Sequence, residues 1–256
     1  MQTIGLIGGM SWESSAEYYR IINQQTNRRL GGVHSAPCLM YSVDFEDIKR
    51  LQHEGDWERL ALAMKEAALR LERGGADFIV LCTNTMHRLA DAISSAVKLP
   101  LLHIADPTAD RIKEAGLQRI GLLGTAFTME QDFYKGRLQR SHGLDVIVPD
   151  EADRRIVHEI IYKELVLGTI RPESRQAYRE IIARLIERGA QGIILGCTEI
   201  MLLVSEEDSA VPLFDTTTIH AVAAVDRALK DRAFFGEVDP VHRQKMRQAK
   251  KRGDST

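Results

Sequence analysis

The feature that most constrains the fold of this chain is an internal repeat of two apolar segments. Residues 4–8 read Ile-Gly-Leu-Ile-Gly, and residues 120–124, at an offset of 116 positions, read Ile-Gly-Leu-Leu-Gly. Residues 75–81 recur in similar form at residues 189–195, at an offset of 114. Because the two offsets are nearly equal and each falls on a strand-like segment, we expect two halves of one design, related by a pseudo-two-fold axis.

Strand patterns alternate with helix patterns along the whole chain. Short apolar runs predict strands at residues 3–7, 39–43, 76–82, 101–104, 119–123, 145–148, 192–195 and 212–214. Amphipathic periodicity predicts helices at residues 14–29, 57–73, 86–96, 106–116, 129–141, 151–167, 173–187 and 217–232. This alternation is typical of parallel sheets with helical cover. The expected fold is therefore α/β: two pseudo-symmetric parallel-sheet α/β domains with the site in the cleft between them.

The starts of three helices carry recognisable local signals. Ser14 and Glu17 form a Ser-x-x-Glu capping box, and Thr128 and Gln131 match the same pattern. Asp106, directly before a proline, is typical of an N-cap residue. These signals predict helices that begin just after Ser14, Asp106 and Thr128.

The repeat also predicts the domain organisation. Residues 1–100 are expected to form the first α/β half, completed by the helix near residues 215–232, and residues 101–212 the second half. Residues 236–256 are rich in Lys, Arg and Gln with few apolar anchors. Such a composition buries too little apolar surface to fold, so a disordered tail is expected there.

Charge and motif content exclude several classes of function. The formal net charge of −2 offers no basic footprint for nucleic acid. No apolar run approaches the roughly 20 residues that span a bilayer, and the N-terminus enters an apolar strand without the basic region of a signal peptide, so a cytoplasmic protein is expected. The Gly8-Gly9 pair lacks the G-x-G-x-x-G spacing of a dinucleotide site, and no zinc-ligand spacing occurs. We therefore expect no cofactor, no metal and a small-molecule ligand.

Four predicted strand ends carry small residues together with hydroxyl or amide side chains. In parallel sheets, ligands bind at the carboxyl ends of the strands, where backbone N–H groups of the following helices suit a carboxylate. The alternative is plain turn and capping chemistry, which uses the same residue types. The four ends are residues 8–11, 82–85, 124–128 and 196–199.

Taken in order, three motifs resemble the aspartate/glutamate racemase family over about residues 3–230. They are Gly-Leu-Ile-Gly-Gly-Met-Ser, Cys-Thr-Asn-Thr-Met-His and Gly-Cys-Thr-Glu. The resemblance implies two pseudo-symmetric domains with the active site between them, and racemisation without pyridoxal phosphate, metal or nucleotide. It also implies two cysteines on opposite faces of the substrate Cα, one removing the α-proton as thiolate and the other protonating the opposite face. A homodimer is compatible with it.

This chain departs from that pattern at the first cysteine. Cys197 occupies the second position, and its counterpart at the offset of 114 is Thr83. Cys82 lies one place earlier, and consecutive strand residues face opposite sides of a sheet, so Cys82 is expected to be structural, as is Cys38. The predicted catalytic residues are Cys197 and Thr83. Because a threonine hydroxyl does not ionise near neutrality, the resemblance implies kinetically favoured L-to-D conversion, with the second-half cysteine acting on the L-enantiomer.

The resemblance also implies a set of substrate-binding residues: Met10, Ser11, Asn84, Thr85, Thr125, Thr128, Lys163, Thr198 and Glu199. Lys163 matches a lysine near the side-chain carboxylate of acidic substrates, although an exposed helical lysine is the alternative. Either Arg50 or Gln52 could occupy the place of an arginine in those members. Glu199 takes the place of a histidine and could orient Cys197, whereas His87 is expected to cap or pack.

Three functions remain open on the sequence. Racemisation of an amino acid, either aspartate and glutamate or a broader range, is the leading one. A decarboxylase of the same superfamily, similar to the arylmalonate decarboxylases, would also need only one cysteine. A non-catalytic amino-acid sensor is the third, since one of the two cysteines is absent.

Overall fold

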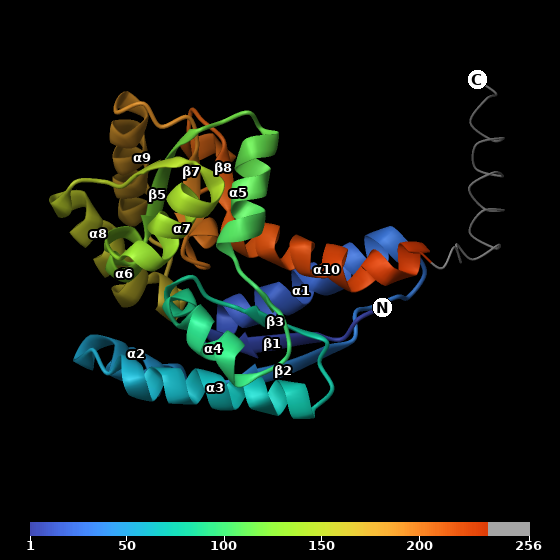
Figure 1. Cartoon of the computed structure of the whole chain (residues 1–256). Helices are drawn as coiled ribbons and strands as arrows, with labels where there is room; N and C mark the ends of the chain where they lie inside the picture. Colours follow the sequence, from blue (N-terminus) through green and yellow to red (C-terminus); the bar gives the residue numbers. More distant parts are fainter. Residues whose placement is uncertain (235–256) are drawn as a thin grey trace, which may run out of the picture.

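A computed structural model, which describes residues 1–234, contains two four-stranded parallel sheets (Figure 1). The first has the order β2-β1-β3-β4 and is built from β1 (Ile4–Gly8), β2 (Cys38–Ser42), β3 (Phe78–Leu81) and β4 (Leu101–Leu102). The second has the equivalent order β6-β5-β7-β8 and is built from β5 (Arg119–Gly124), β6 (Asp145–Ile147), β7 (Ile193–Gly196) and β8 (Leu213–Asp215). The tail expected at residues 236–256 lies outside the described residues.

The strand registers confirm the internal repeat. In the first sheet Gly5 of β1 pairs with Ile79 of β3, and in the second Gly121 of β5 pairs with Ile193 of β7. These pairs are related by the sequence offsets of 116 and 114. The α/β fold with two pseudo-symmetric parallel sheets is therefore confirmed.

Helices cover both faces of the first sheet (Figure 1). On one face, α1 (Trp12–Leu30) packs beside α10 (Thr216–Phe234), and alanines of α10 join a core cluster with Ile4, Leu6 and Tyr18. The other face carries α2 (Phe45–Glu54), α3 (Trp57–Arg73) and α4 (Ala90–Ala96) over a second cluster. The end of the chain thus returns to complete the core of the first sheet.

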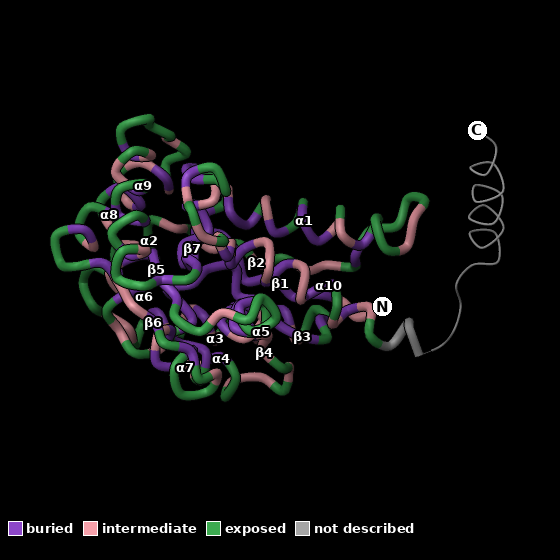
Figure 2. Tube along the Cα trace, turned by 90° about the horizontal axis from the view of Figure 1, so that it is seen from above, coloured by how far each residue is buried: buried purple, intermediate pink, exposed green. Residues whose placement is uncertain are grey.

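The second sheet is covered in the same way. Ile120 and Leu122 pack under α5 (Ala105–Glu114) and α7 (Asp132–His142). Leu123 and Leu195 pack under α8 (Glu151–Lys163) and α9 (Pro172–Glu187). Figure 2 shows the result, with buried residues along the strands and exposed ones along the outer helices. The short elements are α6 (Ala126–Glu130), η1 (Thr85–Leu89), η2 (Leu165–Leu167), η3 (Ile200–Leu202) and η4 (Glu206–Asp208).

Three predicted helix starts are wrong by a few residues. Ser11 caps α1, because its side chain accepts from the Ser14 N–H, and Thr125 caps α6 by accepting from the Thr128 N–H. Helix α5 begins at Ala105, so Asp106 lies inside its first turn and not at the cap. In each case an earlier residue takes the capping position, which leaves the predicted one inside the helix.

Helix α2 was not predicted from the sequence. Asp44 caps its start by accepting from the Glu46 N–H, and Gly55 ends it at a φ of 74°. Both are ordinary helix boundary signals. The predicted helix at residues 151–167 also divides, because α8 ends at Lys163 and the 3₁₀ turn η2 follows.

Glycines let the two central strands of the second sheet approach closely at their carboxyl ends. A Cβ atom added to Gly124 would lie 2.8 Å from the Gly196 carbonyl oxygen, and one added to Gly196 would lie 2.7 Å from the Leu123 carbonyl oxygen. Both distances are too short for a carbon–oxygen contact with backbone. The position of the residue after β7 therefore depends on the absence of side chains here.

We expect Gly124→Ala to lower the free energy of unfolding by about 1–3 kcal/mol, because the methyl group must displace strand backbone. Urea unfolding followed by circular dichroism measures this. Ser141→Ala, on the exposed end of α7, is the matched control and should change stability by less than about 0.5 kcal/mol. Equal stability of the two variants would show that the strand ends are not tightly apposed.

Candidate active site

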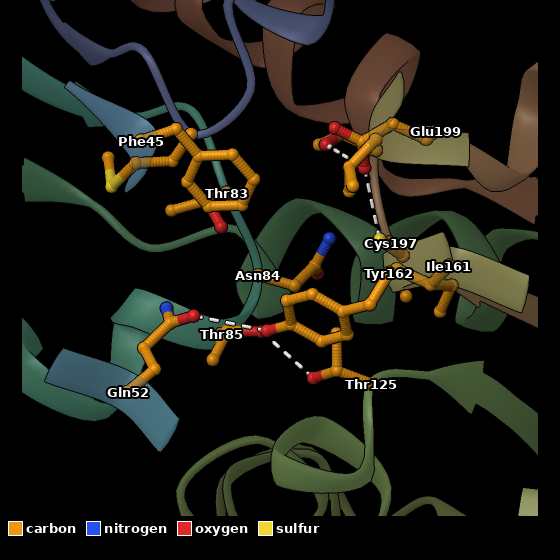
Figure 3. A pocket seen from close by; sticks show the side chains of 14 residues that line it. Phe45, Gln52, Thr83, Asn84, Thr85, Thr125, Ile161, Tyr162, Cys197 and Glu199 are labelled. Atoms are coloured by element: carbon orange, nitrogen blue, oxygen red, sulfur yellow. Dashed lines mark hydrogen bonds between the residues drawn. The ribbon is translucent and has the colours of Figure 1, made fainter. Parts of the chain in front are cut away.

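A small pocket lies where the carboxyl ends of the two sheets face each other. Its free volume is about 20 Å³, which is room for about one water molecule. Both halves of the chain supply its walls (Figure 3). The lining residues are Met10, Phe45, Gln52, Thr83, Asn84 and Thr85 from the first half, and Thr125, Ile161, Tyr162, Val166, Gly196, Cys197, Thr198 and Glu199 from the second.

Cys197 and Thr83 both line this pocket, one from each half (Figure 3). Each follows a central strand directly or by one residue, since β7 ends at Gly196 and β3 at Leu81. The equivalent strand registers place them at corresponding positions of the two sheets. The residues that the offset of 114 pairs in sequence are thus brought to one cavity.

The other two cysteines lie outside the pocket. Cys82 is fully buried in the core cluster of α1 and α10, and its Sγ contacts the Val80 carbonyl oxygen at 3.9 Å. Burial raises the pKa of the Cys82 thiol far above its ordinary value. Cys38 begins β2, and burial raises its pKa to about 11. Both therefore have the surroundings of structural thiols.

The Cys197 thiol donates to a buried carboxylate. Its Sγ lies 3.0 Å from Oε2 of Glu199, which also accepts from the Thr198 hydroxyl at 2.9 Å. The second oxygen of Glu199, Oε1, accepts from the Ser11 hydroxyl at 2.8 Å, so this carboxylate joins the two halves. Glu199 is only 2% exposed and makes no ion pair within residues 1–234.

Burial and the neighbouring Glu199 carboxylate raise the pKa of the Cys197 thiol well above its ordinary value. Backbone N–H groups of Thr198 and Glu199 act in the opposite direction and lower it, but by less. The sequence suggested that a helix N-terminus would draw this pKa down. Only the three-residue turn η3 follows Cys197, so that stabilisation is small and the thiol form predominates in this arrangement.

Threonine hydroxyls form the base of the pocket. Thr85 Oγ1 lies 2.9 Å from Thr125 Oγ1 across the two halves, and Thr128 Oγ1 lies 3.2 Å from Thr125 Oγ1. Thr128 is completely buried and does not line the cavity. It supports Thr125 from behind, and therefore has no direct access to a ligand.

Asn84 enters the pocket with its amide orientation fixed. The Thr216 hydroxyl donates its single hydrogen to the Leu195 carbonyl oxygen at 2.8 Å, so it must accept from the Asn84 Nδ2 at 3.1 Å. The Oδ1 atom of Asn84 is then left buried without a hydrogen-bond partner. A buried acceptor of this kind costs free energy until a donor reaches it.

His87 holds the backbone beside Thr83. Its Nδ1 donates to the Thr83 carbonyl oxygen at 2.7 Å, and its Nε2 accepts from the Ile104 N–H at 3.2 Å. These two bonds require the neutral tautomer with hydrogen on Nδ1. Burial lowers the pKa of His87 well below its ordinary value, which agrees with that state. His87 packs, as the sequence suggested, and it ties the Thr83 loop to the start of the second half.

Five lining residues were missed by the sequence reasoning, and most of them come from α2 and α8. Gln52 of α2 accepts from the Tyr162 hydroxyl at 3.0 Å and closes the pocket across the two halves (Figure 3). The missed helix α2 explains the absence of a firm place for Gln52 in the sequence interpretation. Its capping residues were the available signal. The five missed residues are Phe45, Ile161, Tyr162, Val166 and Gly196.

Lys163 and Arg50 do not reach the pocket. Lys163 is exposed and pairs with Glu159 one helical turn earlier at 2.8 Å, because Tyr162 takes the inward position on α8. The prediction of Lys163 as a substrate-binding residue is therefore not met in this structure, and the alternative of an exposed helical lysine describes it. Arg50 is likewise exposed, between Asp47 and Glu54.

The pocket is consequently poor in positive charge. No lysine or arginine lines it, and Glu199 is the one charged side chain among its walls. Within the part of the chain that the structure describes, no group of three or more His, Cys, Asp and Glu side chains could hold a metal ion. No helix in the same part combines the length and the apolarity needed to cross a membrane.

Comparisons with known proteins agree with this architecture. The chain is 23% identical over 242 residues to the broad-specificity amino-acid racemase RacX of Bacillus subtilis, covering 88% of this chain and 98% of that protein. A crystal structure of a candidate Asp/Glu racemase from Yersinia pestis is 58% identical, with a TM-score of 0.84 and coverage of 90% of this chain and all of that one. An aspartate racemase homologue from Pyrococcus horikoshii is 32% identical, with a TM-score of 0.77 and coverage of 89% and 99%.

The profile of one family covers most of the described chain. It matches residues 7–224, and thus includes both sheets, the Thr83 loop and the Gly-Cys-Thr-Glu segment. With two equivalent parallel sheets and a pocket between their carboxyl ends, the chain belongs to the Asp/Glu/hydantoin racemase family.

Proposed function

We propose that the protein is a cofactor-independent amino-acid racemase in which Cys197 removes the α-proton of the substrate. Family membership and the similarity to the RacX racemase support amino-acid racemisation. The observation that carries the cysteine role is the placement of Cys197, as the one thiol among the pocket walls, across from the equivalent residue Thr83. In this proposal an isomerase needs no group beyond the side chains and water.

The chemistry requires a base held against Cα and donors that stabilise the carboxylate as it gains enolate character. Cys197 would approach one face of Cα as a thiolate. The hydroxyls of Thr85, Thr125 and Thr198, together with the Asn84 amide, supply the polar groups around it. Met10 and Gly196 leave room for the backbone of the substrate.

Thr83 faces the opposite side of the substrate in this proposal. Its hydroxyl can pass a proton from water to the carbanion, but it cannot remove an α-proton at a useful rate, because an alcohol is far less acidic than a thiol. Conversion from L to D, in which Cys197 is the base, should therefore be fast and the reverse slow. The asymmetry is kinetic, since the equilibrium between enantiomers is fixed.

The lining of the pocket favours an uncharged substrate side chain. Phe45, Ile161, Tyr162 and Val166 are apolar or neutral, and Gln52 adds an amide. A second carboxylate would enter without a lysine or arginine to pair with, and burying an unpaired charge is costly. Of the two ranges left open by the sequence, the broader one is therefore preferred over a strict requirement for aspartate or glutamate.

Cys197→Ser should reduce exchange of the α-proton with deuterated solvent at least about 100-fold, because the serine alcohol is a far poorer base. Mass spectrometry of L-amino acids incubated in deuterium oxide measures the exchange. A few per cent or more of wild-type exchange in a folded Cys197→Ser variant would refute the assignment. A sensor would exchange nothing even in the wild type, and a decarboxylase would release carbon dioxide from an arylmalonate.

Cys82→Ala and Cys38→Ala are the matched controls for this experiment. Each removes a thiol outside the pocket, so turnover should remain near that of the wild type. Core truncation at Cys82 should cost about 1 kcal/mol of stability. Loss of turnover in folded Cys82→Ala would place the reactive thiol in the wrong strand register.

Thr83→Cys should open the D-to-L direction. In the wild type, an L-amino acid should exchange its α-proton and yield D-product, whereas the D-enantiomer presents its α-hydrogen to Thr83 and should react at least about 100-fold more slowly. A thiol at residue 83 supplies the missing base. Chiral chromatography of each enantiomer separately, in wild type and variant, measures both rates. Equal initial rates from L and D in the wild type would show that another base serves the Thr83 face.

Matched neutral and acidic substrates test the side-chain preference. Asparagine and aspartate differ by one charge at nearly constant shape, as do glutamine and glutamate. We expect kcat/KM to be at least about tenfold higher for the neutral member of each pair, because the pocket offers no cation for the second carboxylate. Equal or faster turnover of aspartate and glutamate would show that a cation, such as Lys163 after a movement of α8, reaches the bound substrate.

A further inference from the structure

The Glu199 carboxylate has no evident structural purpose that a neutral side chain would not serve better. It is 2% exposed and satisfied only by the hydroxyls of Ser11 and Thr198 and the thiol of Cys197. All three partners donate to it, so its four lone-pair sites keep one position free for a further donor. Burying a carboxylate without a cation is costly, which indicates that its charge has a use.

The rest of the pocket shows the same unmet demand for a donor. The Oδ1 atom of Asn84 is buried without a partner, in an amide whose orientation the Thr216 hydroxyl fixes. Two acceptors, one of them charged, thus belong to the walls of a cavity that no lysine or arginine enters. A ligand that completes this pocket must bring N–H donors and a positive charge.

We propose that Glu199 binds the α-ammonium group of the substrate, and that this ion pair releases the Cys197 thiol to ionise. The proposal rests on the proposed racemase function and assigns Glu199 as the residue that selects α-amino acids over other carboxylic acids. It replaces the general substrate-binding role that the sequence gave to Glu199. An arylmalonate or a hydroxy acid carries no cation and would meet only repulsion here.

The coupling follows from the position of Cys197 between opposing influences. In the empty pocket the carboxylate 3.0 Å away disfavours a second negative charge on sulfur. When an ammonium group neutralises Glu199, the backbone N–H groups of Thr198 and Glu199 remain and favour the thiolate. The base would then form only when an amino acid is present.

The proton balance of the step is complete with water as the acceptor. The S–H bond of Cys197 breaks and its proton passes to water, leaving the electron pair on sulfur. The thiolate then takes the α-proton, so a new S–H bond forms as the Cα–H bond breaks. The electron pair of that bond is held by the substrate as its carboxylate gains enolate character.

Other titratable groups near Glu199 do not replace it in this role. Tyr162 of α8, Tyr178 of α9 and Tyr18 of α1 interact with Glu199 electrostatically, and burial raises the pKa of each phenol. They therefore stay neutral over the range in which Cys197 ionises. The charge that governs Cys197 is that of Glu199.

The pH profile of Cys197 alkylation tests the proposal without any turnover. Iodoacetamide is added to the full-length protein over a series of pH values, and the Cys197 peptide is quantified by mass spectrometry. Glu199→Gln should move the midpoint of the profile down by at least about one pH unit, because a neighbouring negative charge typically raises a pKa by 1–3 units. Glu199→Asp keeps the charge and should keep a midpoint near that of the wild type. An unchanged midpoint in Glu199→Gln overturns the proposal.

Ser11→Ala is the matched control for access to the thiol. It removes the hydrogen bond that Glu199 accepts from the other half but leaves the carboxylate in place. A variant that merely opens the pocket should speed alkylation at every pH without moving the midpoint. If Ser11→Ala moves the midpoint as far as Glu199→Gln does, the effect is one of access and the proposal fails.

Protection of the wild-type thiol tests the ammonium site and needs no variant to fold. L-Alanine and L-lactate share their shape and carboxylate and differ in the ammonium group. L-Alanine should slow alkylation of Cys197 at least about tenfold more effectively than L-lactate at equal concentration, since ion pairing is lost in the hydroxy acid. Equal protection by both, or by neither, overturns the assignment of Glu199. A protein that protects as expected but racemises no amino acid would refute the proposed function and leave this inference standing.

Discussion

The pairing of β1 with β3 and of β5 with β7 is the constraint on which the rest of the structure depends. In parallel strands the side chains alternate between faces, so a fixed register decides which residue at the strand end faces the opposing sheet. With Gly5 against Ile79 and Gly121 against Ile193, Thr83 and Cys197 meet at one cavity while Cys82 turns into the core. A slip of one residue in β3 would exchange Cys82 and Thr83 and would restore a two-thiol site.

This dependence explains why much of the site could be predicted from the sequence. The repeat offset gives the register, and the register gives Thr83 as the counterpart of Cys197. The residues that could not be predicted lie on helices. Whether Tyr162 or Lys163 faces inward is decided by the rotation of α8 over its sheet, to which a helix of mixed polarity gives only a weak signal. Helix α2 carries Gln52 over the cavity, and its short amphipathic pattern was not recognised as a helix.

The contacts that close the pocket between the halves are mostly polar and small in number. They include Ser11 with Glu199, Thr85 with Thr125 and Gln52 with Tyr162. Each such bond contributes a net stability of about 1 kcal/mol. A free volume of about 20 Å³ does not admit an amino acid, so these bonds must exchange for bonds to substrate or water whenever a ligand enters. Hydroxyls and amides suit this exchange, because they find equivalent partners in water, whereas an apolar seal would resist opening.

A site with one thiol also has a different proton economy from a site with two. When two cysteines face each other, one turnover leaves the first protonated and the second ionised, which is the starting state for the reverse direction. When Cys197 stands opposite Thr83, each L-to-D turnover leaves Cys197 protonated, and the proton delivered on the other face comes from water. The thiol must then lose its proton to solvent before the next substrate reacts. A pocket closed by a few exchangeable hydrogen bonds permits that exchange at every opening, and a buried carboxylate beside the sulfur keeps the thiol protonated, and so unreactive toward other electrophiles, while no amino acid is bound.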